Sequence, residues 1–136
     1  MFFLKVHDGV RKWIVGDVQR FAEYLETVSP SKHRICIELC PAPAVAVYGD
    51  KSGECGFGVF IRRLVKCGIA IACDWLPYRK DGISGRADAR RLILESLAHE
   101  WCHYERFRDG RPDNHRGVER RTRCLVDRFL GMKGGE

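Results

Sequence analysis

Two histidines and a glutamate in the stretch LAHEWCHYERF, residues 97–107, have the types and spacing of a metal-dependent hydrolytic site. On a helix, His99 and His103 lie about one turn apart, so both imidazoles emerge on one side and can reach one zinc ion at about 2.0–2.1 Å. Glu100 lies about 100° around the helix from His99, where it can hold a metal-bound water. Zinc lowers the pKa of its water towards about 7, and a neighbouring carboxylate then accepts the proton as the water attacks a carbonyl. We therefore predict metal ligands at His99 and His103 and a general base at Glu100.

The surroundings of this motif matter, because the three-residue pattern alone also occurs on ordinary solvated helices. Here it interrupts the otherwise apolar stretch LILESLAHEWCHY, where imidazole and carboxylate groups are costly without partners. Two of the five histidines in the chain occupy this spacing. Both observations favour a zinc site over a solvated helix face.

A zinc site needs a third protein ligand, and two nearby acids are weaker candidates for it. Glu105 is two residues beyond His103 and points roughly away from the pair, where it could still support a ligand. Asp109 has the spacing of a metzincin third ligand, but Arg106 occupies the position at which that pattern has a glycine. The candidates farther along the chain are better placed.

Glu119 is the third ligand that we predict, and His115 is its rival. Both lie on a final helix expected over residues 115–130, after a turn at 109–114. Glu119 projects from within the arc of that helix expected to face inward, formed by Val118, Thr122, Leu125, Val126 and Phe129. An acid among buried residues needs a cation, and an antiparallel return of this helix would bring Glu119 to the metal-facing side of the preceding one. As a first-turn acid it would otherwise only favour the helix dipole, whereas His115 would otherwise cap the helix or stabilise an oxyanion.

The elements that must position this site alternate between strand-like and helical patterns. Residues 17–28 have helical spacing with Asp17 as N-cap, and a short strand pair is expected around Asp8 and Gly9. Strand-like runs follow at residues 34–40, 44–49, 56–64 and 66–75. A helix over 88–108 ends at Gly110, and Asp113 or Asn114 caps the last helix. We predict a single α+β domain over residues 1–136, with a small, mostly antiparallel sheet.

Composition limits the classes of function. The longest apolar stretches are too short to span a membrane, and the N-terminus turns polar too early for a signal peptide, so we expect a cytoplasmic protein with no membrane contact. Seven cysteines without a CxxC pair argue against a disulfide framework, although Cys36 and Cys40 are an alternative zinc pair. The net charge of +6 fits either nucleic-acid contact or a solvated, arginine-rich surface.

Residues 97–130, LAHEWCHYERFRDGRPDNHRGVERRTRCLVDRFL, resemble the C-terminal half of small gluzincin-type zinc metallopeptidases, including compact forms from phages and bacterial mobile elements. In that family an HExxH helix, a short turn and a second helix with a glutamate form the site. The resemblance implies a minimal zincin-like fold, a zinc cofactor and a peptide or protein substrate. It also implies that His99, His103 and Glu119 are ligands, that Glu100 is the general base, and that GFGVFI is an edge strand pairing with an extended peptide.

A lesser resemblance connects the chain to SprT-like metalloproteases, which share the HExxH helix but take a histidine as third ligand and act on DNA-bound proteins. The segment NHRG, residues 114–117, and the basic last helix fit that family, although the spacing is shorter. This resemblance implies the alternative function, a DNA-associated or non-catalytic basic binding protein that retains a zinc site.

Overall fold

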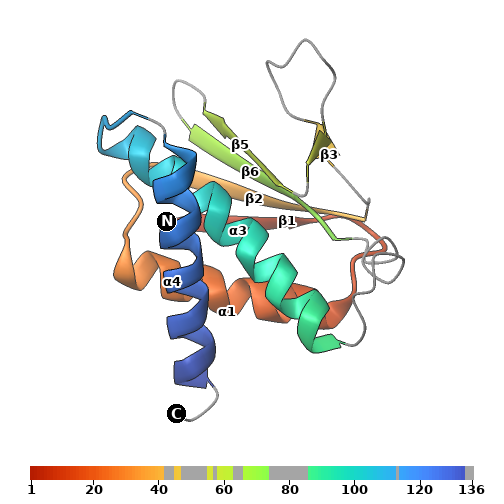
Figure 1. The fold of residues 1–136 in the computed structure, drawn as a ribbon. Helices are drawn as coiled ribbons and strands as arrows, with labels where there is room; N and C mark the ends of the chain where they lie inside the picture. Colours follow the sequence, from red (N-terminus) through yellow and green to blue (C-terminus); the bar gives the residue numbers. More distant parts are fainter. Residues whose placement is uncertain are drawn as a thin grey trace.

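The computed structural model describes residues 1–41, 45–46, 55–56, 58–62, 66–73, 86–112 and 114–133. Its elements in chain order are β1 (Phe2–Val6), α1 (Lys12–Val28), β2 (Arg34–Cys40), β3 (Val45–Ala46), β4 (Cys55–Gly56), β5 (Gly58–Arg62), β6 (Lys66–Ala72), α3 (Arg86–Arg108) and α4 (His115–Lys133). Figure 1 shows α1, α3 and α4 on one face of the sheet. α3 packs against β5 and β6, and α4 packs on α3. No helix in the described part of the chain combines the length and apolar character that a membrane span needs.

The sheet is mostly parallel, and the prediction of a mostly antiparallel sheet is wrong. Its strand order is β1-β2-β6-β5, in which β1, β2 and β6 run parallel and β5 is antiparallel to β6. The strands β3 and β4 form a separate antiparallel pair. The direction follows from α1, which carries the chain from the end of β1 back to the start of β2, so that the two strands run the same way. The combination of helices and sheet that was expected is present.

The first helix begins earlier than its sequence pattern predicted. Gly9, with φ of 98°, turns the chain out of β1, and Lys12 starts α1 where the second strand of a hairpin was expected. Asp17 is therefore inside the helix and does not cap it. Its buried carboxylate accepts a hydrogen bond from Arg20 at 2.5 Å and forms an ion pair with Arg90 of α3 at 3.2 Å, which ties α1 to α3.

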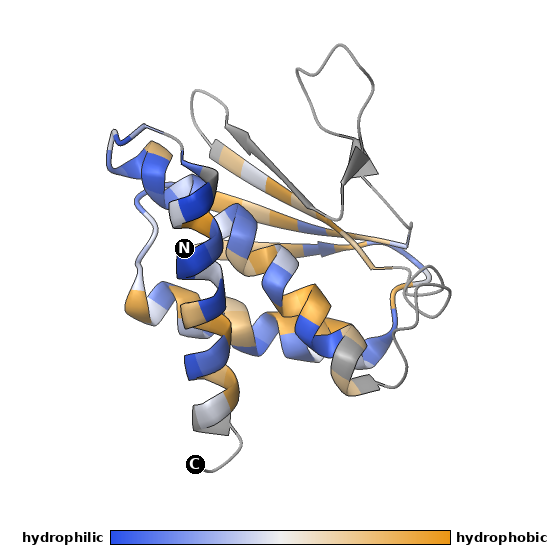
Figure 2. Ribbon diagram, in the orientation of Figure 1, coloured by the Kyte–Doolittle hydropathy of each residue, from blue (hydrophilic) through white to orange (hydrophobic). Residues whose placement is uncertain are grey.

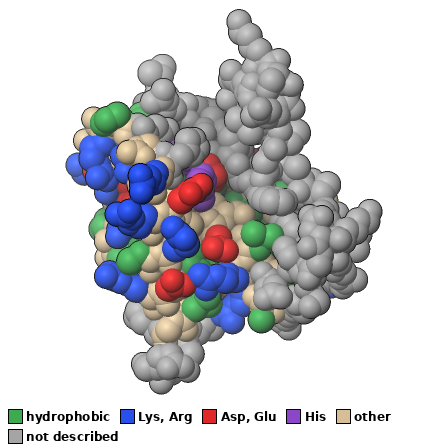
Figure 3. All heavy atoms as spheres, viewed as in Figure 1, with side chains coloured by type: hydrophobic (Ala, Val, Ile, Leu, Met, Phe, Trp, Pro, Cys, Tyr) green, Lys and Arg blue, Asp and Glu red, His purple; other side chains and the backbone are tan. Residues whose placement is uncertain are grey.

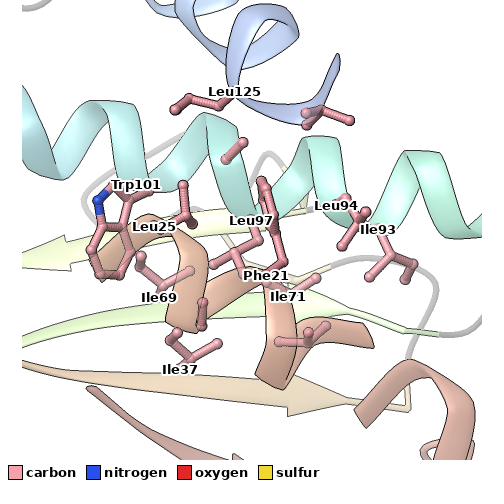
Figure 4. Close-up of a cluster of buried hydrophobic side chains, with 14 of the residues drawn as sticks. Phe21, Leu25, Ile37, Ile69, Ile71, Ile93, Leu94, Leu97, Trp101 and Leu125 are labelled. Atoms are coloured by element: carbon pink, nitrogen blue, oxygen red, sulfur yellow. The ribbon is translucent and has the colours of Figure 1, made fainter. Parts of the chain in front are cut away.

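The core lies between the sheet and the helices. Alternate residues of β2 (Ile35, Ile37 and Leu39) face α1 and α3, and Figure 4 shows Phe21, Leu97 and Trp101 above the strands. The predicted inward face of α3 is confirmed, since Leu94, Leu97, Trp101 and Tyr104 are fully buried. Figure 2 shows the same division, with apolar strands and a strongly hydrophilic outer side on α4.

The connection between α3 and α4 forms as predicted. Gly110 has φ of 66°, and the backbone hydrogen bonds from Gly110 to Phe107 (3.2 Å) and from Arg111 to Arg106 (2.8 Å) form a Schellman motif. Asn114 caps α4 through a 3.1 Å hydrogen bond from the Gly117 amide. The predicted inward arc of α4 is also confirmed, because all its members are buried: Val118, Thr122, Leu125, Val126 and Phe129.

Gly110→Ala is expected to lower the free energy of unfolding by about 1 kcal/mol, because an L side chain disfavours this left-handed backbone. Among the described residues, no atom lies within 4 Å of a Cβ at this position, so the effect is conformational and not steric. Gly131→Ala is the matched control: its Cβ would likewise meet no atom of the described residues within 4 Å, but in helical backbone the change should raise stability by up to about 1 kcal/mol. Denaturant unfolding measures both variants, and shifts of the same sign would contradict the conformational argument.

Candidate metal centre

His99 and His103 converge on one point beside α3. Their Nε2 atoms are 3.1 Å apart, and both side chains are half-buried. Two zinc–nitrogen bonds of about 2.05 Å whose nitrogens lie this far apart would meet at an angle of about 100°, close to tetrahedral. In the absence of a metal, the same distance accommodates one N–H···N hydrogen bond between neutral imidazoles. The helical spacing thus places two nitrogens where they can share a divalent ion.

Glu100 lies between this pair and the sheet-facing side of α3. Around the helix it comes about 60° after His103 and about 40° before the buried Tyr104. Glu100 as a whole residue is only 8% exposed. A carboxylate in so dry a position gains strongly from a nearby cation or proton donor. Around α3, this buried carboxylate therefore neighbours the two imidazoles on the side that leads to the core.

The contacts between α3 and α4 fix which side chains of α4 can approach the histidines. Thr122 donates to Cys102 Sγ at 3.8 Å, and Arg121 donates to Glu105 at 3.1 Å. Glu105 is buried and also accepts a hydrogen bond from Ser29. The Glu105–Arg121 pair therefore marks one side of the α3–α4 interface, away from the histidines as predicted, and the pKa of Arg121 is raised by this hydrogen bond.

Glu119 lies on the other side of this interface, together with the histidines. Around the axis of α3, His99 lies about 60° and His103 about 100° from Cys102, in the direction opposite to Glu105. Around the axis of α4, Glu119 lies about 60° from Thr122, in the direction opposite to Arg121. Since α4 returns antiparallel to α3, with Arg91 near the start of α3 paired to Asp127 late in α4 at 2.6 Å, these directions lead to the same side.

The side chain of Glu119 is exposed, however, and the expectation that it is buried within the inward arc is wrong. It lies at the edge of that arc, one position from Val118 and a turn before Thr122. Within the described residues, no third His, Cys, Asp or Glu donor forms a group with the two imidazoles inside 4.8 Å. As its side chain stands, Glu119 is therefore not a member of such a group.

The other candidates for the third ligand have different surroundings. Asp109 is exposed and pairs with Arg108 at 2.8 Å, which holds the pKa of this carboxyl below its usual range. His115 is the first residue of α4, and its side chain lies outside the described part of the structure. Figure 3 shows histidine at the surface over the middle of α3, bordered by acidic side chains, with lysine and arginine gathered over α4.

Cys102, within the same motif, does not offer a reactive thiol. Burial, with a smaller contribution from Glu105, raises its pKa to about 12, so the thiol stays protonated near neutral pH. Its contact with Thr122 belongs to the packing of α3 on α4. Hydrolytic chemistry at this centre would therefore use water as nucleophile and not this cysteine.

A second group of metal-ligating side chains was missed by the sequence interpretation. His7, Glu38 and Cys40 have donor atoms within 4.8 Å of one another and could hold a metal ion. The alternative pairing of Cys36 with Cys40 is not part of this group. The signal was present in the alternation Glu38-x-Cys40, but it becomes visible only when β1 is known to pair in parallel with β2.

Compared with protein-family models, curated proteins and solved structures, the chain has no significant match to any of them. The interpretation of both groups therefore depends on residue chemistry and geometry.

Proposed function

We propose that this protein is a zinc-dependent peptidase, with His99 and His103 as metal ligands and Glu100 as general base. The observation that carries the proposal is the 3.1 Å approach of two imidazole nitrogens beside a buried carboxylate on one helix. Packing of α3 alone does not explain this combination, because burial removes hydration from each of the three polar groups and so costs free energy.

The residues of the chain divide the work of hydrolysis. A bound zinc ion would acidify its water and polarise the substrate carbonyl. His99 and His103 would hold the ion, and Glu100 would accept one proton from the attacking water as the water oxygen bonds to the carbonyl carbon. The same carboxyl then gives the proton to the amide nitrogen as the C–N bond breaks, leaving a carboxylic acid and an amine.

Glu119 is proposed as the third ligand. It lies on the histidine side of the α3–α4 interface, and its exposed side chain has rotamers open to it that a packed one would lack. A divalent ion would favour the rotamer that brings the carboxylate to the pair, since each bond to the metal offsets the lost side-chain entropy.

An extended peptide is the substrate class that the fold supports best. β5 is the end strand of the described sheet and packs against α3, the helix that carries both histidines. A peptide added to this edge by backbone hydrogen bonds would run alongside α3.

The test is hydrolysis by the full chain loaded with zinc. Incubation with a denatured protein and with a peptide library should produce new termini, detected by mass spectrometry. A chelator should abolish cleavage, and zinc, but not magnesium, should restore it, because magnesium prefers oxygen ligands. Absence of cleavage, or cleavage that survives chelation, would contradict the proposal.

A specific observation also supports the alternative, a DNA-associated binding protein. Arg116, Arg120 and Arg123 recur on one exposed stripe of α4, at a spacing suited to successive phosphates. Salt-sensitive DNA binding that survives chelation, in a preparation that hydrolyses nothing, would favour this function over the peptidase.

A further inference from the structure

A polar cluster lies at the carboxyl ends of β1 and β2, and the backbone fixes its members. Lys5 pairs with Glu38 and Val6 with Leu39 in the parallel register. The His7 amide then donates to the Leu39 carbonyl at 3.2 Å, which extends the pairing by one residue. Because side chains alternate along a strand, His7 joins Glu38 and Cys40 on one face of the sheet.

This cluster is on the sheet face away from the helices. The alternating residues of β2 that pack under α1 and α3 are Ile35, Ile37 and Leu39. Glu38 and Cys40 are half-buried on the opposite face, where Cys40 packs against Ala70 and Ala72 of β6. The cluster and the histidine pair of α3 are therefore separated by the sheet and can be tested independently.

The three donors differ in kind and converge closely. His7 Nε2 is 2.5 Å from Glu38 Oε2, and the Cys40 sulfur completes a group within 4.8 Å. One imidazole, one thiol and one carboxylate suit zinc, whereas calcium and magnesium prefer oxygen alone. We propose that His7, Glu38 and Cys40 form a second zinc site, with three protein ligands and one position open to water or another ligand.

An ion-pair cluster without a metal is the competing explanation. Glu38 contacts His7 and also lies 3.9 Å from Lys5 Nζ, so its charge has partners on both sides. That explanation gives Cys40 only the role of a small packed side chain. Only the metal-site explanation requires the Cys40 sulfur to bind an added metal ion.

Cobalt(II) distinguishes them, because a thiolate bound to cobalt gives charge-transfer absorption in the near ultraviolet that imidazole and carboxylate ligands do not give. The full chain carrying His99→Ala, kept reduced, is titrated with cobalt so that the centre on α3 does not contribute. We expect this absorption to appear and to saturate near stoichiometric addition. Adding Cys40→Ser should abolish it, and His7→Ala should weaken cobalt binding by more than about tenfold.

Cys36→Ser is the matched control, since Cys36 lies on the same strand and face as Cys40 but outside the group. It should leave the absorption unchanged, and circular dichroism should show the same fold for both serine variants. No absorption in the His99→Ala chain, its persistence in Cys40→Ser, or equal loss in Cys36→Ser would overturn the proposal. None of these results depends on peptide hydrolysis, so failure of the peptidase proposal would be seen separately.

Discussion

Glu100→Gln is expected to leave zinc bound and to lower peptide hydrolysis by about 10²–10⁴-fold. Glutamine has nearly the same size as glutamate, so the buried position on α3, which is 8% exposed, stays filled. Its amide can still hydrogen-bond to a water, but it has no basic oxygen able to take a proton and return it to the leaving amine. Only the proton transfer is removed, which is why turnover should fall while metal content does not.

Initial rates on one peptide, zinc content and circular dichroism test this prediction together. Glu105→Gln is the matched control, because Glu105 is equally buried on α3, at 6% exposure, but pairs with Arg121 away from the histidines. Glu105→Gln should lower the free energy of unfolding because it breaks the ion pair with Arg121, and it should leave the rate of peptide hydrolysis per folded molecule unchanged. Wild-type turnover in Glu100→Gln would remove Glu100 from the chemistry, and loss of zinc would make it a ligand or a structural group.

The helices of the C-terminal half could be predicted well because their determinants are local. The apolar period of α3 continues through Leu94, Leu97 and Trp101, and the glycine that ends it adopts the left-handed conformation that few other residues tolerate. These features bring His99 and His103 together whatever the rest of the chain does, since one turn of helix suffices.

The direction of the strands could not be predicted in the same way, because it depends on non-local pairing. The alternating pattern of β2 is compatible with parallel or antiparallel neighbours, and the order is decided by where α1 returns the chain. The same error concealed the second cluster. In an antiparallel hairpin around Gly9, His7 would have had no reason to meet Cys40.

The prediction that Glu119 is buried was wrong for a related reason. A hydrophobic arc on α4 locates the helix face that packs, but a residue at its edge can be covered or open depending on the neighbouring helix. Here Thr122 of α4 contacts Cys102 of α3, and Glu119 lies about 60° from Thr122 around α4. That position leaves the carboxylate exposed and still on the side of the interface that carries His99 and His103.

Zinc affinity in a Cys40→Ser background should therefore identify the third ligand of the α3 centre. We expect Glu119→Ala to weaken zinc binding by about 10²-fold or more, because loss of a ligand should exceed the roughly 10–100-fold cost of losing an outer partner. His99→Ala should lose at least as much, whereas His115→Ala should change affinity by less than about tenfold. Competition with a chromophoric chelator measures all three constants.

Asp127→Ala separates ligation from simple loss of charge. Asp127 is an exposed acid on the same helix, paired with Arg91, and its removal changes the net charge by the same amount as Glu119→Ala. Long-range attraction between exposed charges is screened within about 10 Å at moderate salt, so this control should leave zinc affinity nearly unchanged. Equal effects of Asp127→Ala and Glu119→Ala would reduce Glu119 to a general electrostatic contribution. A larger loss of zinc affinity in His115→Ala than in Glu119→Ala would instead identify His115 as the third ligand. A histidine third ligand is the arrangement of the SprT-like enzymes, so this result would favour the DNA-associated alternative.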